Sequence, residues 1–367
     1  MLFVCISHFS ASYFGRLRES GIPTSALEHV ALIASPTFVT LSGLLLGFLA
    51  RTRPRDSVAL RAKLVDRGLF MLTAGHLLIV VAHIPIAGGL GPALEWGFIT
   101  DVIAIGLLIG PVLIDRVAPG PRVALAGISY VLAWVVVATW HPDHAGLQRA
   151  KEYVFGPSHF LDGNPRLVFD CFPLIPWLAV YVAATALGEY LGRRAAAGRS
   201  HDMIPLLARV AIVCVLAVVV VKGVPFVLKM TGLASTGVLV WTLGWPFQKQ
   251  PPSPAYLGIY AGLGLVLLCG LLAVDARPAL RRWLAVPAAL GRASLVMFIV
   301  QYFLYFSVFV LWNPGYTPLW PLLLLASLAV MVGVGLLWAR FGRNDVFGVG
   351  YRWLVAVAPS TAASSRS

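Results

Sequence analysis

Long apolar runs, interrupted by Pro, Gly and charged positions, follow one another along almost the whole chain. Several exceed the roughly 20 residues that a helix needs to cross a bilayer. The lengths of the runs and the residues that interrupt them predict an all-α transmembrane helix bundle of about ten helices, of which the first is truncated. The predicted segments are 1–14, 26–50, 66–87, 94–114, 122–141, 171–192, 204–227, 255–274, 287–312 and 318–340.

The composition supports this class. Of 367 residues, 59% are hydrophobic and 12% are charged, and the mean hydropathy is +0.85. A soluble domain cannot bury so much apolar surface, and collagen-like, disordered and disulfide-framework proteins are excluded. We predict a single transmembrane domain over residues 1–358 and a disordered Ser/Ala-rich tail over 359–367.

The basic residues predict an orientation. The net charge is +13, which in a soluble protein would suggest binding to nucleic acid. Here 20 of the 28 basic residues fall in alternate loops and the C-terminal tail. By the positive-inside rule those loops are cytoplasmic. We therefore expect a multi-pass protein of the inner (plasma) membrane with both termini in the cytoplasm and no nucleic-acid partner.

Three segments are not expected to be regular membrane-spanning helices. Residues 1–14 are too short to cross a bilayer, so Met1 is expected to be an internal methionine of a longer reading frame. Residues 142–170 are polar and should form an extracytoplasmic cap. Residues 228–254 are half apolar and interrupted, which favours an interfacial or re-entrant segment.

Ionisable residues within apolar segments mark candidate functional positions, because they are costly in a bilayer unless they face protein or water. His76 and His83 are seven residues apart and share one helix face. Histidine can give or take a proton near neutral pH, which suits general acid–base catalysis. The set comprises His8, His29, His76, His83 and Asp101.

Four of these five residues, all except His8, are also given a structural interpretation. His29 and His83 lie near the interface and could be solvated. His76 could be buried and bonded to a backbone carbonyl, and Asp101 could bond to a neighbouring helix. Gln301 and Tyr302 could line a cavity or only pack.

Other patterns indicate packing. Gly43 and Gly47 form a GxxxG pattern, which is typical of close helix contacts. The cysteines form neither a metal site nor a disulfide framework. No phosphate-binding loop, HExxH or GxSxG pattern occurs.

Several motifs resemble the membrane acyltransferase superfamily, which includes type-3 acyltransferases and heparan-alpha-glucosaminide N-acetyltransferase-like and glucan succinyltransferase-like proteins. FVCISHFSASYF around His8 is similar to the end of its first helix, and an arginine is usual about eleven residues earlier, before Met1. Further resemblances follow in order: SPTFVTLSGLLLGF, RGLFMLTAGHLL, TDVIAIGLL, FPLIPWLAVYVAATALGEYLGRR and LGRASLVMFIVQYFLYF.

The resemblance implies an enzyme that moves an acyl group, acetyl or succinyl, from cytoplasmic acyl-CoA to a hydroxyl or amine of an extracytoplasmic glycan or lipid-linked sugar. Acyl-CoA would be a substrate; no permanently bound cofactor or metal is expected, and membrane lipid is the other partner. The catalytic residues would be His8, Asp101 and His76. The acceptor would contact His29, His83, Ser42, Gln301 and Tyr302, and the donor would contact Arg61, Lys63 and Arg67.

Two alternatives remain at this point. Intramembrane His and Asp could form a proton relay in a transporter or flippase for an amphiphile. The chain could also be an inactive membrane scaffold, since the usual arginine would precede Met1.

The predicted orientation can be tested by labelling single cysteines in a background without the four native ones. Cysteines at positions 57, 118, 197 and 279 should be accessible from the cytoplasm, and those at 90, 150 and 316 from outside. The alternation of basic loops is the physical reason. If cysteines in two adjacent loops were each labelled from the side opposite to the expected one, the ten-segment topology would be contradicted.

Overall fold

The computed structural model describes residues 1–17, 26–53, 57–157, 172–231, 249–341 and 351. Helices dominate these residues, which confirms the predicted all-α class. Between Lys249 and Pro252 there is an isolated bridge. The α-helices are α1 (Leu2–Leu17), α2 (Ala26–Ala31), α3 (Ala34–Thr52), α4 (Ser57–Phe70), α5 (His76–Ala87), α6 (Leu90–Leu94), α7 (Ile99–Arg116), α8 (Pro119–Thr139), α9 (Ala145–Val154), α10 (Leu174–Ala196), α11 (Met203–Met230), α13 (Pro254–Asp275), α14 (Pro278–Arg281), α15 (Ala285–Arg292), α16 (Ser294–Tyr302), α17 (Phe309–Trp312) and α18 (Trp320–Phe341).

Eight helical stretches among the described residues are long and apolar enough to cross a membrane, so the chain is a multi-pass membrane protein. Each corresponds to one of the ten predicted segments. They are Ala34–Thr52, Leu60–Ala87, Pro119–Thr139, Leu174–Ala196, Met203–Val220, Pro254–Asp275, Ser294–Trp312 and Trp320–Phe341.

The other two predicted segments also form helices. Residues 1–14 fall in α1, whose apolar part, Leu2–Gly15, is shorter than a span, as predicted. Residues 94–114 contribute α7, which carries Asp101 and, at its end, Asp115 and Arg116. Within the predicted polar cap, the structure places α9. Residues 158–171, 232–248 and the predicted tail 359–367 lie outside the described part.

The exposed faces of several helices are apolar. Val213 and Val219 on α11 are more than half exposed, as are Leu325 and Leu337 on α18. Such surfaces are unfavourable in water but match the acyl chains of a bilayer. These helices therefore form the lipid-facing side of the bundle.

Among the described helices, α3 and α10 form the most extensive contact, and it depends on glycine. A Cβ atom on Gly47 would lie 2.0 Å from the Thr185 carbonyl oxygen, and one on Gly188 would lie 1.9 Å from that of Leu44. The GxxxG pattern thus does mark packing, because only glycine lets the two backbones approach this closely.

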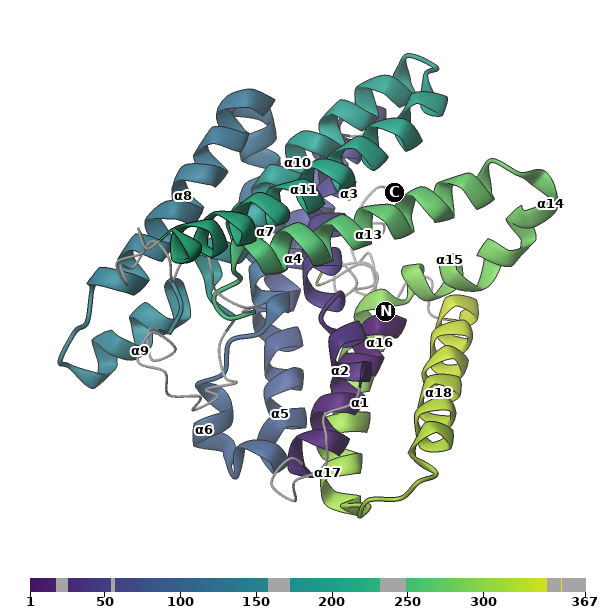
Figure 1. The fold of residues 1–367 in the computed structure, drawn as a ribbon. Helices are drawn as coiled ribbons and strands as arrows, with labels where there is room; N and C mark the ends of the chain where they lie inside the picture. Colours follow the sequence, from purple (N-terminus) through teal and green to yellow (C-terminus); the bar gives the residue numbers. More distant parts are fainter. Residues whose placement is uncertain (18–25, 54–56, 158–171, 232–248, 342–350, 352–367) are drawn as a thin grey trace, which may run out of the picture.

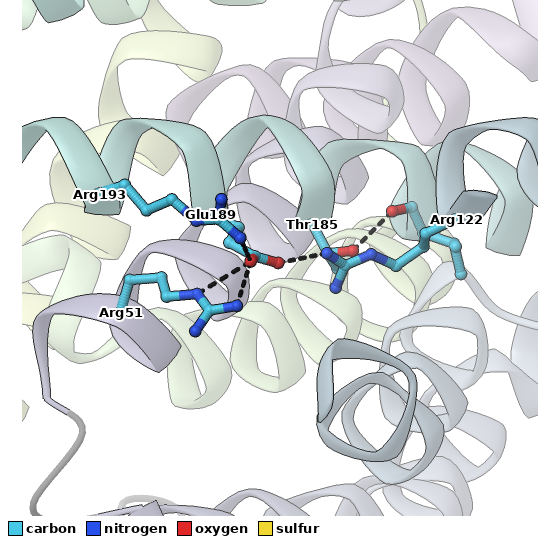
Figure 2. Close-up of polar contacts among 6 residues, drawn as sticks. Arg51, Arg122, Thr185, Glu189 and Arg193 are labelled. Carbon is cyan, nitrogen blue, oxygen red and sulfur yellow. Dashed lines mark hydrogen bonds and ion pairs between the residues drawn. The ribbon is translucent and has the colours of Figure 1, made fainter. Parts of the chain in front are cut away.

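A buried ion cluster fastens the same two helices to α8. Figure 2 shows Arg51, Arg122 and Arg193 converging on the Glu189 carboxylate, which has no exposed surface. The Arg51 Nε atom lies 2.9 Å, and the Arg193 Nη2 atom 2.6 Å, from Glu189 Oε1. The Arg122 side chain is also fully buried and donates to Glu189 Oε2. Three helices are therefore joined through one carboxylate.

The first helix packs against the other end of the chain. Figure 1 shows α1, in purple, beside α16 and α17, in light green, and these helices are in contact. Phe9 of α1 lies edge-on to Tyr305 and Phe309, with ring centroids 6.3 and 5.6 Å apart. Side chains of α1 can therefore form a joint site with residues about 300 positions later.

Replacing Glu189 with Gln should destabilise the protein strongly. It would leave the buried Arg122 guanidinium without a counter-charge, which costs about 3–5 kcal/mol. The measurement is thermal unfolding of the purified protein in detergent, followed by tryptophan fluorescence. The matched control, Asp202→Asn, removes a partly exposed partner of Arg194 and should cost less than about 1 kcal/mol. Equal unfolding temperatures for the two variants would contradict this role of Glu189.

Candidate functional site

A cavity of about 520 Å³ lies between α1, α3, α5, α16 and the turn that follows α16. It extends along α1 from Val4 to Gly15, which on a helix is about 17 Å. Its wall is mostly apolar and aromatic, and the polar lining residues include Ser7, Ser10 and Ser12 of α1. A mostly apolar cavity with a few polar groups is typical of a small-molecule site.

His8 faces this cavity from α1. Its ring lies against two aromatic rings, with centroids 4.6 Å from Tyr302 and 4.9 Å from Phe306. Its Nδ1 atom is buried and makes no hydrogen bond to any described residue. A buried polar atom normally has a partner, so an unpaired one beside a cavity is available to a bound molecule.

His83 lines the cavity from α5 and contacts the same two rings. Its ring centroid lies 4.6 Å from Phe306 and 4.8 Å from Tyr302. The side chain is 2% exposed, so the interpretation of His83 as a solvated interfacial histidine is wrong. Its Nδ1 atom lies 2.9 Å from the Ile79 carbonyl oxygen. Because a carbonyl only accepts, Nδ1 carries the hydrogen and Nε2 is the acceptor in neutral His83.

Tyr302 and Phe306 can both face the two histidines because of the local helix geometry. Tyr302 ends α16, and the next six residues form the π-helical turn η7 (Phe303–Val308). Such turns recur at functional sites. Residues four apart lie on nearly the same face of a helix. The neighbouring Gln301 is fully buried, and its amide makes no hydrogen bond to the described residues; it does not line the cavity.

His76 and Asp101 form a separate pair next to the cavity. The His76 Nδ1 atom lies 2.9 Å from Asp101 Oδ1, and the Phe98 amide donates to Asp101 Oδ2 at 2.8 Å. Asp101 therefore caps the start of α7 and orients His76. Neither residue lines the cavity, but the Phe98 ring contacts both His76 and His83.

The remaining predicted residues lie elsewhere. Ser42 donates to the Phe38 carbonyl oxygen at 2.8 Å and is outside the cavity lining. Only the backbone of His29, in α2, is described. Arg61, Lys63 and Arg67 all lie on α4, where Arg61 forms an ion pair with Asp115. Within the described residues, these three basic side chains do not line the cavity.

Several lining residues could not be recognised in the sequence, among them Lys249, which carries a charge. Phe306 could have been found from its spacing of four from Tyr302. Lys249 and Trp96 belong to irregular segments, where no periodicity points to a common face. Groups of three or more His, Cys, Asp or Glu able to hold a metal ion are absent from the described part of the chain.

The fold and cavity define a multi-pass membrane protein with a histidine-containing site between its first helix and its C-terminal helices. Residues 1–218 match the family model for the catalytic region of heparan-alpha-glucosaminide N-acetyltransferase. The match covers more than half of the chain, so this protein belongs to that family, which supports a membrane acyltransferase-like function. No curated protein and no solved structure matches the chain.

Replacing Asp101 with Ala should remove both the cap of α7 and the bond to His76. We expect a loss of about 1–3 kcal/mol in the free energy of unfolding. Denaturation in mixed micelles measures this loss. The control Asp115→Ala breaks only the exposed pair with Arg61 and should cost less than about 1 kcal/mol. If Asp101→Ala cost no more than Asp115→Ala, the capping role would be wrong.

Proposed function

We propose that this protein is an integral membrane acyltransferase that moves an acetyl or succinyl group from cytoplasmic acyl-CoA to a hydroxyl or amine of an extracytoplasmic glycan or lipid-linked sugar. The observation that carries the proposal is the position of His8. An imidazole whose Nδ1 atom is buried and unpaired among the described residues faces a cavity large enough for a small substrate. Family membership supports the same class of reaction.

His8 would act as the general base. It takes the proton from the acceptor hydroxyl or amine while that oxygen or nitrogen attacks the thioester carbonyl carbon. The carbon–sulfur bond then breaks, and the thiolate of coenzyme A recovers the proton from the imidazolium. Proton transfer by a positioned histidine contributes about 10²- to 10⁴-fold in rate.

His83 and Tyr302 would position the reactants. In neutral His83, Nδ1 is engaged by the Ile79 carbonyl, so its Nε2 atom can accept a hydrogen bond from an acceptor hydroxyl. Tyr302 lies in contact with both imidazole rings. The two residues thus limit where a sugar can lie relative to His8, and correct placement contributes to rate by itself.

The donor would approach from the side that carries the basic loops. Lys63 and Arg67 are four residues apart on α4 and share a helix face, whereas Arg61 points away from them. Lys63 is exposed and Arg67 is half-buried. These cations would attract the phosphates of acyl-CoA, in a manner that salt should weaken.

Replacing His8 tests the proposed role of the base. His8→Gln should lower acyl incorporation into acceptor by about 10²- to 10⁴-fold at equal protein level, because glutamine keeps hydrogen-bonding groups but cannot accept the proton. Radiolabelled acyl-CoA supplied to inverted membrane vesicles provides the measurement.

The control for His8 is His141→Gln. His141 is exposed after the end of α8 and bonds to the Ala138 carbonyl oxygen. The His141→Gln variant should keep acyl incorporation into acceptor within about twofold of wild type, as expected for a substitution at the protein surface. Wild-type incorporation by His8→Gln would refute the catalytic assignment.

A further inference from the structure

Lys249 places a positive charge in the His8 cavity. It lies just before α13, at the end of the chain segment that follows α11, and beyond residues 1–218 that match the family model. Its Nζ atom lies 5.0 Å from the centre of the Phe172 ring, a cation–π contact. His8 and Lys249 both line this one cavity.

The backbone around Lys249 is held in place. The Tyr130 hydroxyl donates to the Pro252 carbonyl oxygen at 2.6 Å, and Ser253 caps α13 by accepting from the Tyr256 amide at 3.1 Å. Ser253 is fully buried. The backbone three to four residues after the lysine is therefore fixed by contacts with α8 and within α13.

No acidic group balances this charge within the described structure. The cavity lining contains neither Asp nor Glu, and Lys249 forms no ion pair with any described residue. Lys249 is partly buried, and a charged group that is partly removed from water normally has a partner, because burial of an uncompensated charge is costly. By contrast, the buried Arg122 guanidinium forms an ion pair with the Glu189 carboxylate.

We propose that Lys249 binds an anionic group of a substrate in the His8 cavity and so selects substrates that carry a carboxylate or phosphate. This rests on the proposed function, because it takes the bound molecule to be the acyl donor or acceptor. The anion can come from a dicarboxylic acyl group such as succinyl or from an acidic sugar. In either case the ammonium–anion pair fixes one end of the molecule while its reacting group lies toward His8.

Binding to the purified protein in detergent tests the proposal without requiring activity. Trp96 lines the cavity, so changes in tryptophan fluorescence can report occupancy. One pair of probes is monomethyl succinate and its neutral analogue dimethyl succinate. The other pair is methyl glucuronide and neutral methyl glucoside. Binding of monomethyl succinate would show that the anionic group belongs to the acyl group. Binding of methyl glucuronide would show that it belongs to the acceptor sugar.

We expect at least one anionic probe to bind 10- to 100-fold more tightly than its neutral analogue, as is typical of a hydrogen bond to a charged group. Lys249→Met should abolish that preference and Lys249→Arg should keep it. The control Arg282→Met removes an exposed cation that also lies over an aromatic ring, 5.7 Å from the centre of Trp283, and it should change nothing. Equal affinity for charged and neutral probes, or an unchanged preference in Lys249→Met, would overturn the proposal.

The pH dependence of binding provides a second test. Burial lowers the pKa of Lys249 to about 8, so the lysine is charged below that pH and loses its charge above it. Anion affinity should fall at least tenfold between pH 7 and 9.5 in the wild type. It should persist in Lys249→Arg, because arginine stays protonated. The other titratable groups lining the cavity, His8, His83 and Tyr302, are also present in Lys249→Arg. Equal loss in both proteins would therefore contradict the assignment to Lys249.

If the expected binding is observed but no acyl transfer is found, the anion-binding role of Lys249 is supported and the proposed acyltransferase reaction is refuted. If transfer is found, Lys249→Met should raise KM for the anionic substrate by about 10- to 100-fold and change kcat little. Transfer without any anion preference would overturn the role of Lys249 and leave the acyltransferase in place.

Discussion

Polar groups within this molecule must find partners inside the protein, because a bilayer offers none to the helices that cross it. The charges of the Glu189 cluster are paired in this way: a buried carboxylate accepts from arginines of α3, α8 and α10 at the point where glycines bring α3 against α10. The His8 cavity differs. There a buried imidazole nitrogen and a lysine have no such partner among the described residues. The charges of the structural cluster are balanced within the protein, whereas the cavity keeps a cation that a ligand can pair with.

The site depends on contacts between distant parts of the sequence. His8 comes from the first helix, His83 from α5, Tyr302 and Phe306 from the C-terminal half, and Lys249 from the segment before α13. The rings of Tyr302 and Phe306 each contact both histidine rings. Family resemblance over residues 1–218 therefore accounts for only part of the wall. The rest of the cavity wall lies outside residues 1–218. It can therefore differ from that of other members of the family and change which substrates the cavity accepts.

Much of the fold could be predicted from the sequence, since apolar length is a direct requirement of the bilayer. The spacing of His76 and His83 also correctly predicted a shared face, because both rings contact Phe98. Their separate roles could not be predicted: His76 is bonded to Asp101, whereas His83 enters the cavity. Lys249 was missed because an interrupted segment gives no periodicity and because its place in the cavity wall results from tertiary contacts.

The most direct test of the central claim is a cryo-EM structure with a non-reactive acyl-CoA analogue and an acceptor sugar bound together. The account predicts the thioester carbon and the acceptor oxygen or amine in the cavity, with the acceptor atom about 3 Å from an imidazole nitrogen of His8. Reactants bound away from this cavity, or held near His76 with His8 out of hydrogen-bond reach, would contradict it.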